Sequence, residues 1–536
     1  MIALSIAWFT LSVGRPLAHP DEGRYAEIPR EMLLSGDWIT PHLNGLAYLE
    51  KPPLQYWASA AAYRIFGVSE WAARLPALLA AWLGVLAVFL TGRRLWNSSV
   101  AVSAAALLAS SVLYFALGQI LTLDMAFTFL MTATLCTFCM AQVTRDSPSR
   151  ESGQWMLATW ALLALAVLTK GPVAVAIAGA VMLIYMSWQR DWAVLHTLRP
   201  LAGSAIFIAI TAPWFIRVAR ANPDFLHFFF VREHLQRYLT DSAHRIEPWW
   251  YFLAILAAGV LPWLPQMGQA LLGGWRASAP PGRFDPQRLL WTWCVFILVF
   301  FSLSSSKLAP YVLPIIPALA LLTAAGGAHR NVRALRISLC VLIGAAIALP
   351  VYGLLAALNA HDPLVLRVSN DARPAIVAFD VVALSGAVVC WQAMRRGRPA
   401  AALFGIAITW FLGLTLLFAS VGRDDSLRSG KSLAAQIPTE LAAHAPIFSV
   451  QTYDQTLPFY LRRTFFLVDM RGELDYGLQD SPGVFIADVQ RFEATWRGLT
   501  DAIAIMPHRT YARLVAEGLP MRVLGQDSRR VAVSRR

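Results

Sequence analysis

The stretch that decides the fold begins directly behind the first hydrophobic segment, with HPDEGRYAE at residues 19–27, and continues to YLEKPP at residues 48–53. Acids, bases and tyrosines gather here, whereas most of the chain that follows is apolar. Pro52 and Pro53 donate no backbone hydrogen bond and push Lys51 toward an extended conformation, so we expect a helix to begin at Pro53. The pattern favours a fixed polar loop that binds a charged ligand. The alternative is a solvated connector that carries charge without function.

The composition places the chain among polytopic membrane proteins. Its 536 residues are 57% hydrophobic and only 14% charged. Soluble domains do not combine so little charge with so many apolar residues. All five cysteines lie in hydrophobic runs, and we therefore expect neither a disulfide framework nor a Cys/His metal motif.

About 13 hydrophobic spans are expected when each apolar stretch is compared with the roughly 20 residues that cross a bilayer. They lie at 2–13, 71–92, 99–117, 122–143, 154–169, 172–189, 201–219, 249–273, 289–304, 309–326, 334–357, 375–394 and 400–420. The first run is short and no basic residue precedes it. We therefore expect no signal peptide, and a chain that begins inside its first helix.

The connectors between these spans alternate in charge. Every arginine-dense short connector falls in one alternate set, which the positive-inside rule assigns to the cytoplasm. The net charge of +13 is thereby explained without nucleic acid as a partner. The same rule places the N-terminus inside, and it places the opening loop, residues 15–70, and the C-terminus outside.

Two domains are predicted, a membrane domain over residues 1–421 and a small soluble α/β domain over 422–536. The second contains short strands and amphipathic helices in place of long apolar runs. Strands are expected at 447–450, 464–468, 483–486, 502–506 and 529–533, and helices at 433–444, 488–498 and 508–517. In the opening loop, helices at 29–34 and 54–66 are expected to lie on the membrane surface.

Polar residues with possible chemistry recur on the external connectors. Asp124 opens a span, Lys170 lies between two spans with almost no loop, and His234 follows an aromatic run. Lys307 and Tyr311 share a turn that is broken by prolines. Each also has a structural explanation, such as helix capping, snorkelling to the interface or membership in an aromatic belt.

Together with the opening loop, these residues form a set of cations, carboxylates and tyrosines on one membrane face. Such a set suits a ligand with an anionic head and a lipid tail, because phosphates bind Arg and Lys while a divalent cation binds Glu, Asp or His. The sequence contains no nucleotide-binding fingerprint and no nucleophile motif. We therefore predict no nucleotide cofactor.

The combined motifs resemble the GT-C superfamily of lipid-carrier-dependent glycosyltransferases, and within it the bacterial aminoarabinose transferases of lipid A. The resemblance runs in the right order from residue 21 to about residue 320. Its motifs are DExRYAE at 21–27, GDW at 36–38, YxEKPP at 48–53, LD at 123–124, TKG at 169–171, REH at 232–234, PW at 262–263 and SKLxPYxLP at 306–314. The C-terminal domain offers no motif for comparison.

The resemblance implies a multi-pass enzyme of the bacterial inner membrane, with its active site and C-terminal domain facing the periplasm. Such enzymes move 4-amino-4-deoxy-L-arabinose from undecaprenyl phosphate to a phosphate of lipid A, the membrane anchor of lipopolysaccharide, and so confer resistance to polymyxin-type peptides. Membrane lipids are the remaining partners that it implies. Direct displacement would invert the anomeric centre.

The resemblance also implies roles for single residues. Asp21 and Asp124 correspond to the paired acidic residues of the first two external loops, and Lys51 joins them in the catalytic set. Glu50 and His234 are the candidate ligands of a divalent metal ion, with zinc as the candidate ion. The residues implied in substrate binding are Arg24, Tyr25, Tyr48, Lys170, Lys307 and Tyr311.

Two other functions stay open at this point. A GT-C transferase could use another polyprenyl-phosphate-linked sugar or a hydroxyl acceptor on protein or glycan, in which case Asp21 would act as a true base. A transporter of lipid-linked sugars is the alternative from a different class. Transporters usually show inverted repeats and charged or broken helices at mid-membrane, and the sequence indicates neither.

Overall fold

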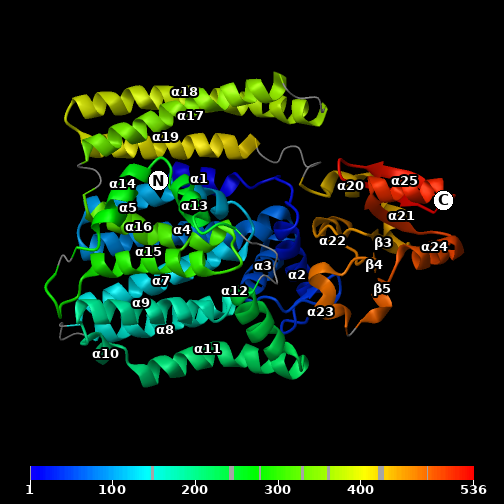
Figure 1. Cartoon of the computed structure of the whole chain (residues 1–536), viewed down its shortest axis with the longest axis horizontal. Helices are drawn as coiled ribbons and strands as arrows, with labels where there is room; N and C mark the ends of the chain where they lie inside the picture. Colours follow the sequence, from blue (N-terminus) through cyan, green and yellow to red (C-terminus); the bar gives the residue numbers. More distant parts are fainter. Residues whose placement is uncertain are drawn as a thin grey trace. The chain divides into compact units, whose positions relative to one another are not determined.

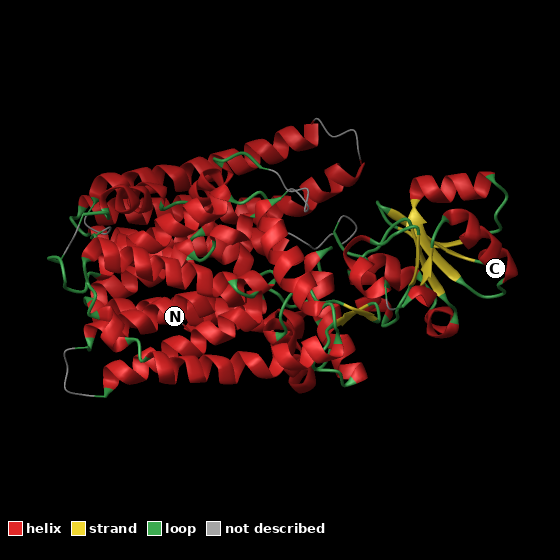
Figure 2. Ribbon diagram, turned by 60° about the horizontal axis from the view of Figure 1, so that its bottom comes forward, coloured by secondary structure: helices red, strands yellow, loops and turns green. Residues whose placement is uncertain are grey.

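A computed structural model gives the chain as a set of long helices and a smaller part that contains a sheet (Figures 1 and 2). The structure describes residues 2–145, 150–240, 247–276, 279–327, 331–358, 363–420, 428–479 and 481–535. Its contacts divide the chain into two compact units. The membrane unit contains residues 1–11 and 77–421, and the sheet unit contains residues 12–76 and 422–536. Residues 12–76 thus group with the C-terminal residues, although the predicted domains assign them to the membrane domain.

The membrane unit consists of helices. They are α1 (Ile2–Thr10), α4 (Glu70–Leu95, from residue 77 on), α5 (Ser98–Ala109), α6 (Val112–Gly118), α7 (Leu123–Val143), α8 (Glu151–Lys170), α9 (Val173–Gln189), α10 (Val194–Thr197), α11 (Pro200–Ala221), η1 (His227–Gln236), α12 (Arg237–Leu239), α13 (Tyr251–Gly259), α14 (Leu264–Gly273), α15 (Pro286–Leu303), η2 (Ala309–Val312), α16 (Ile315–Ala325), α17 (Val332–Leu358), α18 (Pro363–Arg395) and α19 (Pro399–Ser420). Helix α7 packs along α8, α8 along α11, and α17 to α19 pack against one another (Figure 1).

Each predicted span holds helix, but the predicted count of about 13 is not confirmed. Of the described helices, eight are long and apolar enough to cross a membrane, or up to nine if α5 and α6, which are bent by 67°, form one span. The other predicted spans are short or broken. Helix α9 has 17 residues, and the stretch at 249–273 divides into α13 and α14 around Pro262, because proline cannot continue a helix ladder.

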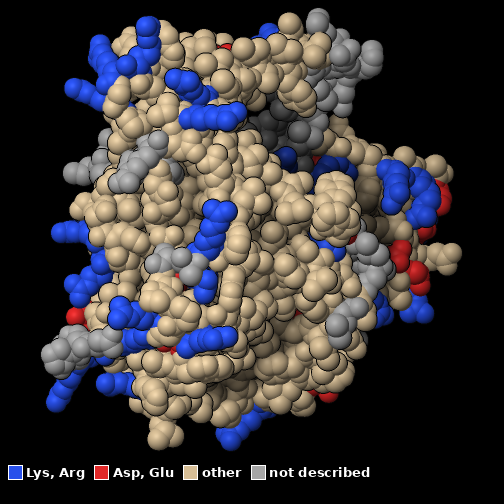
Figure 3. All heavy atoms as spheres, turned by 60° about the vertical axis from the view of Figure 1, so that its left-hand side comes forward, with Lys and Arg blue, Asp and Glu red and all other residues tan. Residues whose placement is uncertain are grey.

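Basic side chains cluster at one end of the membrane helices (Figure 3). The exposed arginines of the arginine-dense connectors include Arg93, Arg190, Arg276 and Arg395. Arg395 lies 4.7 Å from the ring centre of Trp391, and Arg288 lies 4.8 Å from that of Trp188. Such Arg–Trp pairs are typical of a membrane–water boundary.

The sheet unit combines the opening loop with the C-terminal residues. Its N-terminal elements are α2 (Asp21–Ser35), β1 (His42–Leu43), β2 (Leu46–Ala47), α3 (Leu54–Phe66) and the start of α4. Its C-terminal elements are α20 (Lys431–Gln436), α21 (Thr439–His444), β3 (Ile447–Val450), α22 (Thr456–Leu461), β4 (Phe466–Val468), η4 (Gly472–Leu474), α23 (Asp475–Leu478), η5 (Pro482–Val484), β5 (Phe485–Ile486), α24 (Val489–Gly498), β6 (Ile503–Pro507), α25 (His508–Ala516), β7 (Arg522–Gln526) and β8 (Arg530–Ser534).

Six strands form the sheet in the order β5-β4-β3-β6-β8-β7 (Figure 2). The first four are parallel, and β8 and β7 join them antiparallel. Strands β3 and β6 are apolar almost throughout, as buried parallel strands require. Helices α24 and α25 cover one face, where Phe492, Trp496 and Leu514 pack against the strands.

The five predicted strands are confirmed to within two residues, whereas β7 was not predicted because only one of its residues is buried. The predicted helix at 433–444 is two helices, α20 and α21, separated by Pro438. In the opening loop, α3 is confirmed at 54–66. Helix α2 ends before Gly36, whose φ of 70° is the left-handed conformation that glycine adopts easily, but it begins at Asp21 and not at Pro29.

Candidate functional site

The start of α2 is held by Arg74, a fully buried residue at the start of α4. Arg74 donates two hydrogen bonds of 2.7 Å to the carboxylate of Glu22, and two more to the carbonyls of Arg15 and Pro16. The second carboxylate oxygen of Glu22 also accepts a hydrogen bond from the backbone N–H of Ala18. This bidentate pair fixes the direction in which α2 presents its first turn.

Arg24 is the centre of a charged cluster at that first turn. Its guanidinium lies 3.0 Å from the carboxylate of Asp21 and forms a second ion pair with Glu473 of η4. It also lies 5.9 Å from the ring centres of Tyr25 and Tyr48. The Asp21 side chain is 54% exposed, whereas the side chains of Arg24 and Glu473 are mostly buried. Asp21 is therefore the most exposed of these three charged groups.

Two tyrosines beside this cluster carry hydroxyls that lack a hydrogen-bond partner among the described residues, Tyr48 and Tyr56. Both side chains are almost fully buried, and the Tyr56 ring stacks on Tyr25 at 5.9 Å. Burial raises the pKa of both hydroxyls, so they remain neutral donors. Buried polar groups normally have partners, and two such hydroxyls side by side with Arg24 indicate a site for a polar ligand.

Glu50 and Lys51 lie in the extended turn between β2 and α3, as the prolines predict. The Lys51 ammonium donates to the carbonyl of Glu50 at 2.9 Å, and both side chains are half-buried. Pro53 caps α3, which begins at Leu54, one residue later than predicted. The six predicted site residues of the opening loop thus come from α2 and this turn. Together with Tyr56 and Glu473 we call them the opening-loop cluster; the six are Asp21, Arg24, Tyr25, Tyr48, Glu50 and Lys51.

A second cluster lies in the membrane unit, around Lys170 at the end of α8. The Lys170 ammonium hydrogen-bonds to the carboxylate of Asp124 in the first turn of α7. It also lies 4.7 Å from the ring centre of Tyr311 and 5.4 Å from that of Phe127. The structure therefore brings Asp124, Lys170 and Tyr311 together. Lys307 is buried in the turn that precedes η2, next to the buried Ser306.

His234 lies in η1, a π-helical segment that adjoins the end of α8. Its Nδ1 is 2.6 Å from the carbonyl oxygen of Phe229, and its Nε2 is 3.3 Å from that of Lys170. Gly171 has φ of 83°, and a Cβ there would lie 2.6 Å from Nε2, so glycine is required for this approach. Within the described ranges, no group of three or more His, Cys, Asp and Glu residues is arranged to hold a metal ion.

Both parts of the chain match family models. Residues 433–535 match the aminoarabinose transferase C-terminal domain, and residues 2–229 match the dolichyl-phosphate-mannose-protein mannosyltransferase model. An undecaprenyl phosphate-alpha-4-amino-4-deoxy-L-arabinose arabinosyl transferase from Edwardsiella ictaluri is 34% identical over 88% of this chain and 87% of its own length. The chain belongs to this aminoarabinose transferase family.

Solved structures agree with this assignment. The crystal structure of ArnT from Cupriavidus metallidurans bound to undecaprenyl phosphate matches with a TM-score of 0.90 and 34% identity, over 100% of this chain and 97% of that one. The archaeal oligosaccharyltransferase AglB from Archaeoglobus fulgidus, at a TM-score of 0.50 and 12% identity over 94% of this chain and 69% of its own, shares the fold alone. The predicted GT-C fold with a C-terminal α/β domain is confirmed, and the chain is a multi-pass membrane glycosyltransferase.

Three residues of the sheet unit in this aminoarabinose transferase are not among the site residues predicted from the sequence: Arg74, Tyr56 and Glu473. An arginine inside the predicted span 71–92 was a usable signal, because a charge there needs a partner. Tyr56 lies on the predicted helix 54–66, on the face opposite to its exposed apolar residues. Glu473 had no local signal, since its partner Arg24 is far away in the sequence.

Proposed function

We propose that this chain transfers 4-amino-4-deoxy-L-arabinose from undecaprenyl phosphate to a phosphate of lipid A, on the periplasmic side of the inner membrane. The observation that carries the proposal is the pair of buried hydroxyls of Tyr48 and Tyr56, which have no hydrogen-bond partner in the described part of the chain and lie beside the Arg24–Glu473 ion pair. A sugar with hydroxyls and an ammonium group would satisfy these donors and this carboxylate. The periplasmic orientation is supported by the arginine-dense connectors of the membrane unit.

In the opening-loop cluster, the carboxylates suit the ammonium of the amino sugar. Glu473 is held by Arg24 and by a hydrogen bond from Gln455, and Asp21 is the exposed carboxylate next to it. Burial raises the pKa of Glu473 more than Arg24 lowers it, so the carboxylate gains from a cationic ligand. Lys51 and Arg24 are the cations available for phosphate in this cluster.

In the membrane unit, Lys170 is the cation best placed to hold a phosphate. Asp124 fixes the direction of its ammonium, and the Tyr311 ring covers another side of it. A lysine that is held in place before the substrate binds needs no reorganisation when charge develops on the leaving group. The Lys170 side chain is 14% exposed, so it lies mostly but not completely buried.

The reaction needs little proton transfer. A lipid A phosphate is already ionised near neutral pH, and its oxygen attacks the anomeric carbon while the bond to undecaprenyl phosphate breaks. The electron pair of that bond leaves with the phosphate, and the anomeric centre inverts. The difficulty is to bring two anions together, which oriented cations address directly. Asp21 then orients the amino sugar instead of acting as a base.

We also propose that the chain binds a divalent metal ion, with zinc as the candidate; His234 in the membrane unit and Glu50 in the sheet unit are each a candidate ligand. Nδ1 of His234 contacts the carbonyl oxygen of Phe229 and Nε2 that of Lys170, so a metal ion bound at Nε2 would have to replace the second contact. A bound ion would neutralise phosphate charge. No step of the reaction described above depends on this ion, because the residues of the two clusters already bind and orient the substrates.

The test is mass spectrometry of lipid A from a polymyxin-sensitive Gram-negative strain that lacks its own transferase. We expect an added aminoarabinose with the unchanged chain, none with Asp21→Ala, and normal modification with Glu440→Ala. Glu440 is a matched control, because it is an exposed carboxylate in the first turn of a helix, α21, of the same unit. Unmodified lipid A from well-expressed protein would contradict the proposal and point to another sugar or a hydroxyl acceptor.

A further inference from the structure

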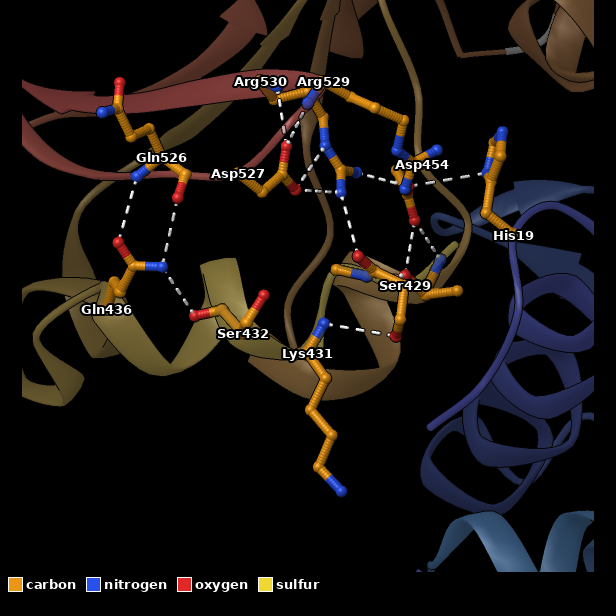
Figure 4. Close-up of polar contacts among 12 residues, drawn as sticks. His19, Ser429, Lys431, Ser432, Gln436, Asp454, Gln526, Asp527, Arg529 and Arg530 are labelled. Atoms are coloured by element: carbon orange, nitrogen blue, oxygen red, sulfur yellow. Dashed lines mark hydrogen bonds and ion pairs between the residues drawn. The ribbon is translucent and has the colours of Figure 1, made fainter. Parts of the chain in front are cut away.

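A buried ionic cluster in the sheet unit lies outside the residues that touch substrate in the proposed reaction. Its centre is Asp454, a residue after β3 that is 2% exposed. The Asp454 carboxylate accepts a hydrogen bond of 2.8 Å from Arg529, forms an ion pair with Arg530, and accepts from the backbone N–H of Thr456 at 2.9 Å (Figure 4). We call Asp454, Arg529 and Arg530 the Asp454 cluster.

Arg530 connects this cluster to two more segments. Its guanidinium pairs with Asp527, and it donates to the carbonyl of Ser429 at 3.3 Å (Figure 4). Burial disfavours the charge of Asp454, but Arg530 and its neighbours outweigh burial and hold the pKa of Asp454 below its usual value. Buried ion pairs seldom increase stability over apolar packing, because each charge loses its hydration. We therefore ask which backbone conformation these charges fix, and not how much stability they add.

The conformation in question is that of residues 453–456, the end of the loop from β3 to α22 together with the first residue of α22, which we call loop 453–456. This loop packs backbone to backbone against α2 at Gly23. A Cβ on Gly23 would lie 2.5 Å from both the carbonyl carbon of Gln455 and the nitrogen of Thr456. Gly23 directly precedes Arg24, and Gln455 donates a hydrogen bond to Glu473, the partner of Arg24.

The segment before α2 meets the same cluster. The backbone N–H of His19 donates to the carbonyl of Arg428 at 2.6 Å, and its Nδ1 lies 3.6 Å from the Asp454 carboxylate. Figure 4 shows the His19 side chain directed at Asp454. Residues on both sides of Asp21 are thus in contact with the loop that the cluster holds.

We propose that Asp454 and Arg530 are positioning residues: they fix loop 453–456 so that its contact with Gly23 sets the place of Asp21 and Arg24 relative to Glu473. The C-terminal domain would then be a working part of the catalytic region. This inference rests on the proposed function, because only in that reaction does the place of Asp21 and Arg24 control the rate.

A purely structural ion cluster would behave differently. Its loss would lower stability and leave the rate of the remaining folded enzyme unchanged. A positioning cluster predicts a fall in kcat that exceeds the change in KM for the donor, since displaced groups lose their orientation toward the reacting atoms while most donor contacts elsewhere remain. It also predicts that a change at Gly23, which touches no charge, has the same effect.

The experiment uses the full-length purified chain with Asp454→Asn, Gly23→Ala and the double variant. Gly498→Ala is the matched control, because a Cβ at Gly498 meets nothing within 4 Å. Two quantities are measured: hydrogen exchange of residues 18–27, and kcat and KM with undecaprenyl phosphate-linked aminoarabinose as donor and lipid A as acceptor.

We expect both single variants to exchange faster in residues 18–27 and to lose about a hundredfold in kcat, with KM changed by less than about threefold. The double variant should be no slower than the worse single variant, because both changes act through one contact. Exchange and kcat like those of Gly498→Ala would overturn the inference. If Asp454→Asn does not fold, Gly23→Ala decides alone.

The exchange measurement separates this inference from the proposed function. If the unchanged chain transfers no aminoarabinose, the proposed function fails, and faster exchange in Gly23→Ala would still support the positioning contact. If the unchanged chain is active and neither exchange nor kcat responds to the substitutions, only the positioning inference fails.

Discussion

The guanidinium of Arg74 contacts both carboxylate oxygens of Glu22, from Nε and from Nη2, each at a distance of 2.7 Å. Both side chains are almost completely buried. The remaining donors of Arg74 go to the carbonyls of Arg15 and Pro16, so the chain on either side of the pair is held as well. This interaction links the start of α2 to the start of α4 within the sheet unit.

We expect Arg74→Gln to lower the free energy of unfolding by about 3 kcal/mol, because the buried Glu22 carboxylate loses its bidentate partner and keeps only the longer ion pair with Arg15 and the N–H of Ala18. Arg94→Gln is the matched control in the same helix. Arg94 pairs with Glu151 at 3.0 Å, but its side chain is 53% exposed, and a pair of this kind contributes less than about 1 kcal/mol. Denaturation of the two purified variants measures the difference. Equal losses would contradict the role given to Arg74.

The pair of Lys170 and Asp124 leads to a prediction about activity. We expect Lys170→Met to lower kcat/KM at least about a hundredfold, the usual order for loss of one oriented group that stabilises developing charge. Arg220→Met, which removes an exposed cation from the end of α11, should leave kcat/KM unchanged. Transfer assays with purified protein distinguish the two. Normal activity of Lys170→Met would show that this lysine only anchors α8 at the interface.

The hydroxyls of Tyr48 and Tyr56 should matter for substrate and not for stability. Because neither has a hydrogen-bond partner among the described residues, Tyr48→Phe and Tyr56→Phe should unfold no more easily than the unchanged chain, yet raise KM for the donor about tenfold. Tyr63→Phe is the control on the same helix as Tyr56. The Tyr63 hydroxyl donates to the carbonyl of Ala26 at 3.0 Å, so its loss should cost about 1 kcal/mol of stability and leave KM unchanged. Lower stability and an unchanged KM in Tyr48→Phe and Tyr56→Phe would contradict a sugar site at these hydroxyls.

The local features of the opening loop could be predicted because single residues decide them. Pro52 and Pro53 set the extended turn and the start of α3, and Gly36 ends α2. The parallel strands were predictable because apolar runs of four or five residues stand out in a polar background. Strand β7 depended on its pairing with β8, which a short window does not contain, whereas the break between α20 and α21 had a local signal in Pro438.

The partners of the site residues could not be predicted in the same way. Arg24 pairs with Glu473, and Gly23 packs on Gln455, across more than 400 residues of sequence. Such contacts come from tertiary packing, and nothing in the local pattern near Glu473 or Asp454 distinguishes them from other acids. The sequence therefore indicated the opening-loop residues of the cluster but not the C-terminal residue Glu473, which pairs with one of them.

The pH dependence of stability offers a prediction about Glu31, a buried residue of α2. Its carboxylate oxygens accept hydrogen bonds from the backbone N–H groups of Asn44 and Gly45 at 2.8 and 2.9 Å. Burial, followed by the charge of Glu27, raises the pKa of Glu31 from 4.5 to about 8. The folded chain therefore keeps the Glu31 proton up to about pH 8, whereas the unfolded chain releases it near 4.5.

It follows that the stabilising contribution of this proton is complete below pH 4.5 and is lost as the pH rises through about 8. The slope reaches at most about 1.4 kcal/mol per pH unit. His19 has the opposite tendency, because burial lowers its pKa from 6.5, so its effect on stability fades as the unfolded chain loses this proton above that pH. Unfolding free energies between pH 6.5 and 8 should therefore fall for the unchanged chain and stay nearly constant for Glu31→Gln, which has no proton to lose. Parallel curves for the two proteins would mean that Glu31 is ionised in the folded state.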